Sequence, residues 1–202
     1  GDQKIVSNIV FMGQGEPLIN IKNLITAVQI LKDKKGLNYG NKKITVSTSG
    51  IANKIPEAAD EIGTYLALSL HAPNDELREE IMPINKKFKI KDLIQQLKYY
   101  TSVVKEPIFL EYVMLKGVND TEDCAKQLVK IMAQFPSKVN LIEFNSWPGV
   151  KFQPTERKDI EKFSKFIQDK GYMSFIRRSR GDDVLAACGQ LRTESEKKSK
   201  LN

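Results

Sequence analysis

Six short apolar segments alternate with stretches of helical periodicity along this chain, and the alternation limits the fold more than any other feature. The apolar segments are "IVFMG" (9–13), "KITVSTSG" (43–50), "YLALSLHA" (65–72), "PIFLEYVML" (107–115), "KVNLIEFN" (138–145) and "YMSFIRRS" (172–179). Short apolar runs of this kind predict β-strands. The continuous run "IVFMG" predicts a strand that is buried on both faces.

Amphipathic stretches lie between these segments. Leu24, Ile25, Val28 and Leu31 recur at helical spacing, and "KDKKG" closes that stretch with cations and a glycine suited to a helix end. Further helices are predicted over 54–63, 75–82, 91–104, 121–135 and 157–171. About six strands separated by helices predict parallel βαβ units, either in an open doubly wound sheet or in a partial (β/α) barrel.

The length of 202 residues suits one domain or a large part of a bigger one. We expect residues 1–192 to form the barrel portion and the polar segment "TESEKKSKLN" (193–202) to form a tail. The sequence carries 32 Lys and Arg against 25 Asp and Glu, a net charge of +7. A basic chain of this kind favours polyanionic partners such as nucleic acid.

Cysteine and histidine usage limits the possible chemistry. The chain has two cysteines, Cys124 and Cys188, and one histidine, His71. These are too few for a disulfide framework, and they cannot form a tetrahedral zinc site unless carboxylates complete it. No apolar run approaches a membrane span, and the first residues "GDQKIVSN" lack a signal-peptide core. We therefore expect a cytoplasmic protein with reduced thiols, no metal site of its own and no membrane partner.

Polar and small residues follow every predicted strand. The strand ends are "GQGEP", "STSG", "SLHAPND", "VMLKGVND", "FNSWPG" and "RSRGDD". In parallel α/β folds the carboxyl ends of the strands open into one crevice, where ligands bind. The sequence therefore predicts a binding site built from these six segments together.

The first two strand ends offer backbone access and a carboxylate. Gly15 allows close approach to the backbone, and Glu16 is suited to holding an ammonium group. Ser47 and Ser49 place two hydroxyls on the same side of their strand, suited to a ribose or a carboxylate. Each segment taken alone is equally compatible with a tight turn closed by local hydrogen bonds.

Three later residues have similar alternatives. His71 is either a structural histidine or a ligand contact, and Asn145 is either a loop cap or a reader of an adenine edge or carboxylate. Trp147, the only tryptophan, either stacks on a base or packs as a partly buried side chain. Pattern alone does not separate these interpretations.

The C-terminal segment "RRSRGDDVLAACGQL" combines arginines with a cysteine. The segment supplies permanent positive charge for phosphates at Arg177, Arg178 and Arg180. If these arginines lie near Cys188 in the fold, they lower the pKa of its thiol. Cys188 is then a candidate nucleophile. Cys124, inside a helical apolar stripe, is expected to be structural.

Several of these segments together resemble one known family. In order they are "VFMGQGEPL", "ITVSTSG", "LALSLHAPND", "IMPINKK", "EYVMLKGVND", "VNLIEFN" and "RRSRGDD...AACGQL". They resemble the RlmN family of radical S-adenosylmethionine (SAM) RNA methyltransferases along nearly the whole chain. The resemblance implies a partial (β/α) barrel and methylation of carbon 2 of adenosine in large-subunit ribosomal RNA and in transfer RNA.

The resemblance also assigns site residues. It implies that Gly15 and Glu16 receive the methionine amino group of SAM, and that the other SAM contacts are Ser47, Ser69, Leu70, His71 and Asn145. Cys188 matches the methyl-carrying cysteine of the family. By resemblance, one SAM methylates this thiolate, and a second SAM gives a deoxyadenosyl radical that takes a hydrogen from the S-methyl group. The resulting methylene radical adds to the adenine carbon.

One family motif is absent. The family holds its 4Fe–4S cluster with CxxxCxxC, and two cysteines at positions 124 and 188 do not replace it. The resemblance places that motif, the first barrel strand and a small RNA-binding domain ahead of "GEP". It further implies an electron donor such as flavodoxin or ferredoxin. We therefore expect that this chain alone has no methyltransferase activity.

Three alternatives stay open at this point. A close relative, the Cfr-type enzyme, methylates carbon 8 of adenine with the same chemistry. A non-catalytic RNA-binding fragment is a second alternative, and a barrel enzyme for phosphorylated metabolites, with the arginines as a phosphate clamp, is a third. RNA affinity that is unaffected by loss of Cys188 and by added SAM would indicate the RNA-binding fragment, and binding of a sugar phosphate but not of SAM would indicate the metabolite enzyme.

Overall fold

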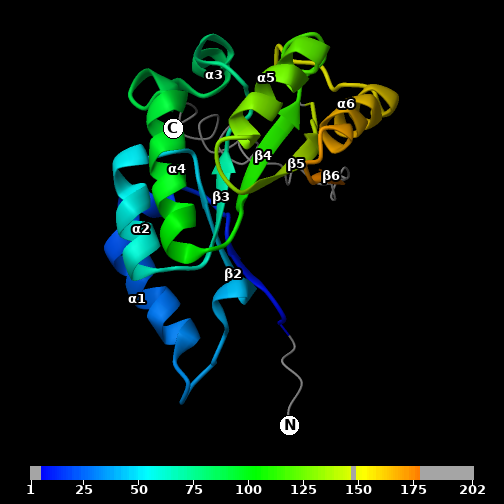
Figure 1. The fold of residues 1–202 in the computed structure, drawn as a ribbon. Coiled ribbons are helices and arrows are strands. Elements are labelled where there is room, and N and C mark those ends of the chain that lie inside the picture. The colour runs from blue at the N-terminus through cyan, green and yellow to red at the C-terminus, as the bar shows by residue number, and fades with distance from the viewer. Residues whose placement is uncertain (1–5, 147–148, 178–202) are drawn as a thin grey trace, which may run out of the picture.

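The computed structural model describes residues 6–146 and 149–177, and these residues form one parallel sheet with helices along one side (Figure 1). Within them the strands are β1 (Ile9–Phe11), β2 (Ile44–Thr48), β3 (Tyr65–Ser69), β4 (Ile108–Met114), β5 (Ser137–Glu143) and β6 (Ser174–Arg177). Their spatial order is β1-β2-β3-β4-β5-β6, and each neighbouring pair is parallel. Strand order that follows chain order, with crossovers of one hand, keeps every helix on the same face. A doubly wound sheet reverses its strand order, so the fold is a partial (β/α) barrel.

The α-helices fill the crossovers that the sequence predicts. They are α1 (Ile21–Lys32), α2 (Ile55–Glu61), α3 (Asp75–Ile81), α4 (Ile90–Val104), α5 (Glu122–Met132) and α6 (Arg157–Asp169). Short 3-10 turns cover Pro17–Asn20, Asn41–Lys43, Ala52–Lys54 and Pro83–Lys86. Side-chain caps begin two of the helices: Asn74 accepts from the Leu77 amide and Thr121 from the Cys124 amide. None of the helices described is long and apolar enough to cross a membrane.

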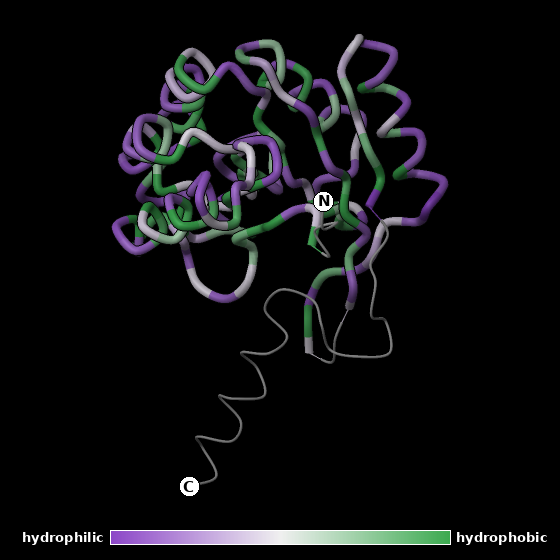
Figure 2. Tube along the Cα trace, turned by 90° about the horizontal axis from the view of Figure 1, so that it is seen from below, coloured by the Kyte–Doolittle hydropathy of each residue, from purple (hydrophilic) through white to green (hydrophobic). Residues whose placement is uncertain are grey.

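The two faces of the sheet differ in chemistry. Along β2, buried residues alternate with half-buried ones, because successive side chains point to opposite faces. The helix-facing set forms the hydrophobic core, with members such as Val46, Leu68 and Leu110 at 1% exposure or less. Figure 2 shows apolar and hydrophilic stretches alternating along the helices that cover this core. The opposite face carries the polar residues described below.

The first strand departs from its prediction. Val10 is 58% exposed and Met12 is 39% exposed, so the "IVFMG" segment is not buried on both faces. The physical reason is position, because β1 is at the edge of the described sheet and only β2 pairs with it. A continuous apolar run does not distinguish an edge strand from a central one.

The turn after α1 also differs from its prediction. The helix ends at Lys32, and the residue with a left-handed φ is Asn38 (φ 48), not Gly36. The Asp33 side chain accepts from the Lys35 amide at 2.9 Å and closes the turn locally. The predicted boundary between residues 192 and 193 lies outside the described residues.

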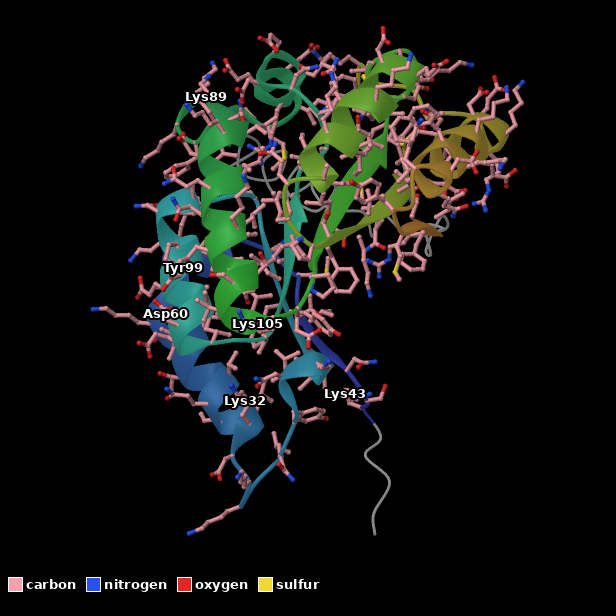
Figure 3. The ribbon with its side chains drawn as sticks, in the orientation of Figure 1. Lys32, Lys43, Asp60, Lys89, Tyr99 and Lys105 are labelled. Atoms are coloured by element: carbon pink, nitrogen blue, oxygen red, sulfur yellow. The ribbon has the colours of Figure 1, made fainter. Side chains whose placement is uncertain are left out.

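Hydrogen bonds between helices tie the outer layer together. The Tyr99 hydroxyl on α4 donates to the Asp60 carboxylate on α2 at 2.9 Å, and the two side chains meet on the surface in Figure 3. The Lys32 ammonium donates to the Ile62 carbonyl at 3.1 Å and links α1 to the end of α2. Lys105 lies at the opposite end of α4 from Lys89, and Lys43 lies farther along in the same direction, where the strands start (Figure 3). The site lies at the opposite, carboxyl ends.

Candidate SAM site at the strand ends

A row of polar side chains crosses the face of the sheet that the helices leave uncovered. The strand register pairs Ser69 of β3 with Glu111 of β4, and Glu111 with Asn140 of β5. Residues that pair directly across parallel strands project from the same face. The parallel topology therefore brings together residues that are far apart in the sequence.

Glu16 connects the ends of β1 and β2. Its Oε1 accepts from the Leu18 amide at 3.1 Å, and its Oε2 accepts from both the amide and the hydroxyl of Ser49 at 2.7 Å. A carboxylate has about four lone-pair positions, so Oε1 can still accept from a ligand ammonium. Gly15 beside it has a left-handed φ of +84°, which a side chain rarely adopts. The Glu16 carboxylate therefore ties the "GQGEP" turn to the end of β2.

The serines at the end of β2, Ser47 within the strand and Ser49 directly after it, lie as the alternation predicts. Ser47 and Ser49 are half-buried on the uncovered face, whereas Thr48 between them is buried at 1% exposure. The Thr48 hydroxyl accepts from the Gly50 amide at 3.0 Å and shapes the turn. The Ser49 hydroxyl already donates to Glu16, so Ser47 is the more suitable of the two for binding a ligand.

Leu70 can contribute little to ligand binding except packing, because its side chain is buried and its backbone groups are already hydrogen-bonded. Its side chain is 2% exposed and belongs to the hydrophobic core. Its amide donates to the Glu111 carbonyl at 3.0 Å, and its carbonyl accepts from Arg78 Nε at 3.1 Å. The neighbouring Ser69 side chain, half-buried on the uncovered face, is better placed.

His71 is held in one tautomer. Its backbone has a left-handed φ of +58°, and the Val113 amide donates to its Nδ1 at 3.1 Å. Nδ1 therefore carries no proton, and the neutral ring presents its N–H at Nε2. Part of the residue surface stays accessible, but burial of the ring, together with the nearby Arg78 charge, lowers its pKa to about 4. His71 is consequently a neutral hydrogen-bond donor at physiological pH.

Glu111 is a buried carboxylate that sequence reasoning missed. It is 3% exposed, its Oε1 accepts from Asn140 Nδ2 at 2.8 Å, and Arg177 Nη1 lies 3.7 Å from the same oxygen. Burial raises the pKa of Glu111, while the Asn140 hydrogen bond and the Arg177 charge lower it. Its Oε2 has no hydrogen-bond partner among the described residues. The available signal was a single charge within the apolar run "IFLEYVM".

The remaining predicted residues have mixed outcomes. Asn145 is half-buried and follows the end of β5 by two residues, and Arg177 ends β6 beside Glu111. Cys124 is buried at 5% exposure, as a structural cysteine should be. The other predicted residues, Trp147, Arg178, Arg180 and Cys188, lie outside the described residues.

A cleft of about 480 Å³ follows the "GQGEP" turn. Gly15 and Glu16 line it together with Phe11 of β1 and with Leu24 and Ala27 of α1. One wall is therefore backbone and carboxylate, and the other combines apolar side chains with the amides of Asn20 and Asn23. Such a lining suits a ligand that has both a charged and an apolar part.

Comparison with known proteins identifies the family. The family model described as the radical SAM superfamily matches residues 2–128, more than half of the chain. The chain belongs to the radical SAM superfamily. Enzymes of the radical SAM superfamily use SAM and a 4Fe–4S cluster.

Curated relatives of this radical SAM chain are named dual-specificity RNA methyltransferase RlmN. The protein from Methylocella silvestris is 47% identical over 195 residues, covering 96% of this chain and 49% of the relative. The protein from Agrobacterium fabrum is 50% identical over 196 residues, covering 96% of this chain and 48% of the relative. The resemblance to RlmN is therefore confirmed, and the chain spans about half the length of these relatives.

Solved structures agree with the fold. A radical SAM methyltransferase from Sphaerobacter thermophilus is 38% identical with a TM-score of 0.86, covering 91% of this chain and 54% of that one. A domain of pyruvate-formate lyase-activating enzyme from Bacteroides vulgatus matches with a TM-score of 0.65 at 17% identity, covering 85% of this chain and 99% of that one. The second likeness concerns the fold alone.

The residues present fit SAM but not the cluster. The strand ends offer a carboxylate, hydroxyls, a neutral imidazole N–H and an amide, which match the ammonium, ribose, carboxylate and adenine of SAM. Among the residues described, no group of three His, Cys, Asp or Glu is arranged to hold a metal ion. The whole sequence has two cysteines, too few for the CxxxCxxC ligand set.

Proposed function

We propose that this chain is the SAM-binding barrel portion of an RlmN-type RNA methyltransferase, which forms 2-methyladenosine in large-subunit ribosomal RNA and transfer RNA. The observation that carries the proposal is identity of 46–50% to RlmN proteins over nearly the whole chain. The strand-end site supports it, because the described residues proposed to bind SAM lie together at the carboxyl ends of the strands.

Each described site residue has a role in binding SAM. Glu16 accepts from the ammonium at Oε1, while Ser49 holds its Oε2 and keeps the carboxylate in place. Ser47 and Ser69 bind through their hydroxyls from neighbouring strands, and the Nε2–H of His71 donates to an oxygen of the ligand. Asn145 binds with its amide. Leu70 acts through the backbone that it fixes beside His71.

The covalent step is assigned to Cys188. Bound SAM supplies the methyl group and, after reductive cleavage, the radical that activates it. The role of the chain is to present the Cys188 thiolate to SAM and then to the adenine. Arg177, Arg178 and Arg180 supply positive charge that favours the thiolate and attracts RNA phosphates.

The 202 residues by themselves are proposed to lack this activity, because the cluster ligands are absent from them. The proposed partners are ribosomal and transfer RNA, with a flavodoxin or ferredoxin as electron donor. A cytoplasmic location follows from these partners.

The test is a methylation assay in a bacterium that lacks its own C2 methyltransferase. One strain expresses the 202-residue chain, a second expresses it fused behind the N-terminal half of the Agrobacterium fabrum relative, and a third carries Cys188→Ala in the fusion. RNA nucleosides are then quantified by mass spectrometry. We expect 2-methyladenosine only in the second strain.

Other outcomes identify where the proposal is wrong. Methylation by the chain alone contradicts the need for cluster ligands. Formation of 8-methyladenosine by the fusion supports the Cfr-type alternative. Methylation that survives Cys188→Ala removes that residue from the reaction.

A further inference from the structure

Arg78 of α3 is a buried cation beneath the strand-end site. Its exposure is 0%, although arginine is rarely buried completely. Its Nε donates to the Leu70 carbonyl at 3.1 Å, and its Nη2 donates to the carbonyls of Ser49 at 2.7 Å and Ser69 at 3.0 Å. Its Nη1 donates to Asn85 Oδ1 at 2.9 Å. The guanidinium therefore faces backbone oxygens from two strand ends.

The charge of Arg78 is compensated mostly by dipoles. Its hydrogen bonds go to carbonyl and amide oxygens and, more weakly, to Met82 Sδ at 3.9 Å. The Asp75 carboxylate acts on it by charge and through Asn85, whose Nδ2 donates to Asp75 Oδ1 at 2.8 Å. Burial lowers the pKa of Arg78 to about 10, so the side chain stays charged at neutral pH. Burying a charge in this way is costly. Such an arrangement is expected where a particular geometry matters more than stability.

The bonded carbonyls lie just beyond the last residues that pair between β2 and β3, although β3 still pairs with β4 at Ser69. The last paired residues of β2 and β3 are Thr48 and Leu68, and Ser49 and Ser69 follow directly. Beyond that pair, one nitrogen of Arg78 bridges both strands in place of ladder hydrogen bonds. The space for it depends on Gly50, where a Cβ atom would come within 3.1 Å of Arg78 Nη2.

We propose that Arg78 is a positioning residue for SAM, setting the distance between the Glu16–Ser49 pair and the Ser69–His71 segment. This inference rests on the proposed function, because those two groups supply most of the proposed SAM contacts. Arg78 reaches the ligand only through them: Ser49 holds the Glu16 carboxylate, and the Leu70 carbonyl adjoins His71.

Geometry and charge are separable at this position. Arg78→Lys keeps the positive charge, but an ammonium lacks the planar fork that spans two strands and Asn85. If the fork sets the site, Lys is a poor substitute even in a folded protein. Asn85→Ala is a milder variant that removes one anchor of the fork and leaves the three carbonyl bonds.

The experiment is a titration of the ¹⁵N-labelled 202-residue protein with SAM, followed by NMR, with urea unfolding measured in parallel. The control is Leu128→Ala in α5, which removes a fully buried side chain from the core far along the sequence from the site. This control lowers stability without touching Arg78 or its partners.

We expect Arg78→Lys to weaken SAM binding by about tenfold or more, as loss of an outer partner of a binding group does. Leu128→Ala should change the affinity by less than about twofold at a similar unfolding midpoint. Equal affinities in Arg78→Lys and Leu128→Ala overturn the inference. If Arg78→Lys does not fold, the same comparison applies to Asn85→Ala, and affinity equal to that of the control overturns the inference.

Failure of the proposed function is distinguishable in the same data. No SAM-dependent shift in the wild-type protein overturns the SAM site and the role of Arg78 together. Binding by the wild type with unchanged affinity in the variants overturns Arg78 alone.

Discussion

Gly50→Ala tests the packing beneath the site at one atom. Gly50 has φ +106°, and a Cβ there would lie 3.0 Å from Leu93 Cδ2, 3.1 Å from Arg78 Nη2 and 3.3 Å from Leu68 Cδ1. The variant therefore combines a strained backbone with a clash against buried groups. Gly171→Ala is a matched control, because Gly171 has φ +87° but no atom within 4 Å of its Cβ position.

The two variants separate strain from clash. The left-handed backbone costs an alanine about 1–2 kcal/mol, and overpacking of a buried site adds about 1–3 kcal/mol. We expect Gly50→Ala to lower the free energy of unfolding by about 2–5 kcal/mol. Gly171→Ala should lower it by about 1–2 kcal/mol.

The assay is urea unfolding at pH 7 with linear extrapolation, followed by circular dichroism. The expected difference between the variants exceeds the error of the method. Equal losses in Gly50→Ala and Gly171→Ala would contradict this expectation, because they would mean that the Arg78 side chain shifts aside without cost.

Further predictions concern hydrogen bonds and protonation. Burial holds the pKa of His71 at about 4, below its unfolded value near 6.5. The free energy of unfolding should therefore fall by at most about 3 kcal/mol as the pH drops from about 6.5 toward 4. His71→Gln should remove that part of the fall, as measured by urea unfolding. Tyr100→Phe, which removes a buried bond to the Thr64 carbonyl, should cost about 1 kcal/mol in the same assay, whereas Tyr99→Phe at the exposed Asp60 contact should cost less than about 0.5 kcal/mol. Burial raises the pKa of Glu111, so Glu111→Gln should stabilise the protein at pH 7 by roughly 1 kcal/mol, and the gain should shrink as the wild-type carboxyl takes up a proton in acid; a loss at pH 7 contradicts this.

The sequence predicted the arrangement of strands and helices well, for a physical reason. Each amphipathic helix shows its own apolar period, and right-handed crossovers leave few arrangements for six parallel strands. Position in the sheet was less predictable. "IVFMG" is as apolar as a central strand, yet Val10 is 58% exposed, because exposure at β1 depends on what pairs with it.

The site was predicted from residue types at strand ends, but its geometry depends on contacts between strands that the sequence does not show. Local pattern pointed to Glu16 and His71, but it did not show that Glu16 is held by Ser49 or that Val113 fixes the tautomer of His71. These contacts join residues from different strands. Arg78 was missed because, in sequence, it is an ordinary charge on a polar helix "DELREEI".

Mapping the SAM-binding site by NMR shows whether SAM binds at the strand ends. The ¹⁵N-labelled chain is titrated with SAM, and the backbone amide shifts are mapped onto the structure. We expect the largest shifts at Glu16, Ser47, Ser69 and His71. Shifts confined to the separate cleft of about 510 Å³ lined by Phe163 and Phe166 between α5 and α6, or no shifts at all, would contradict it.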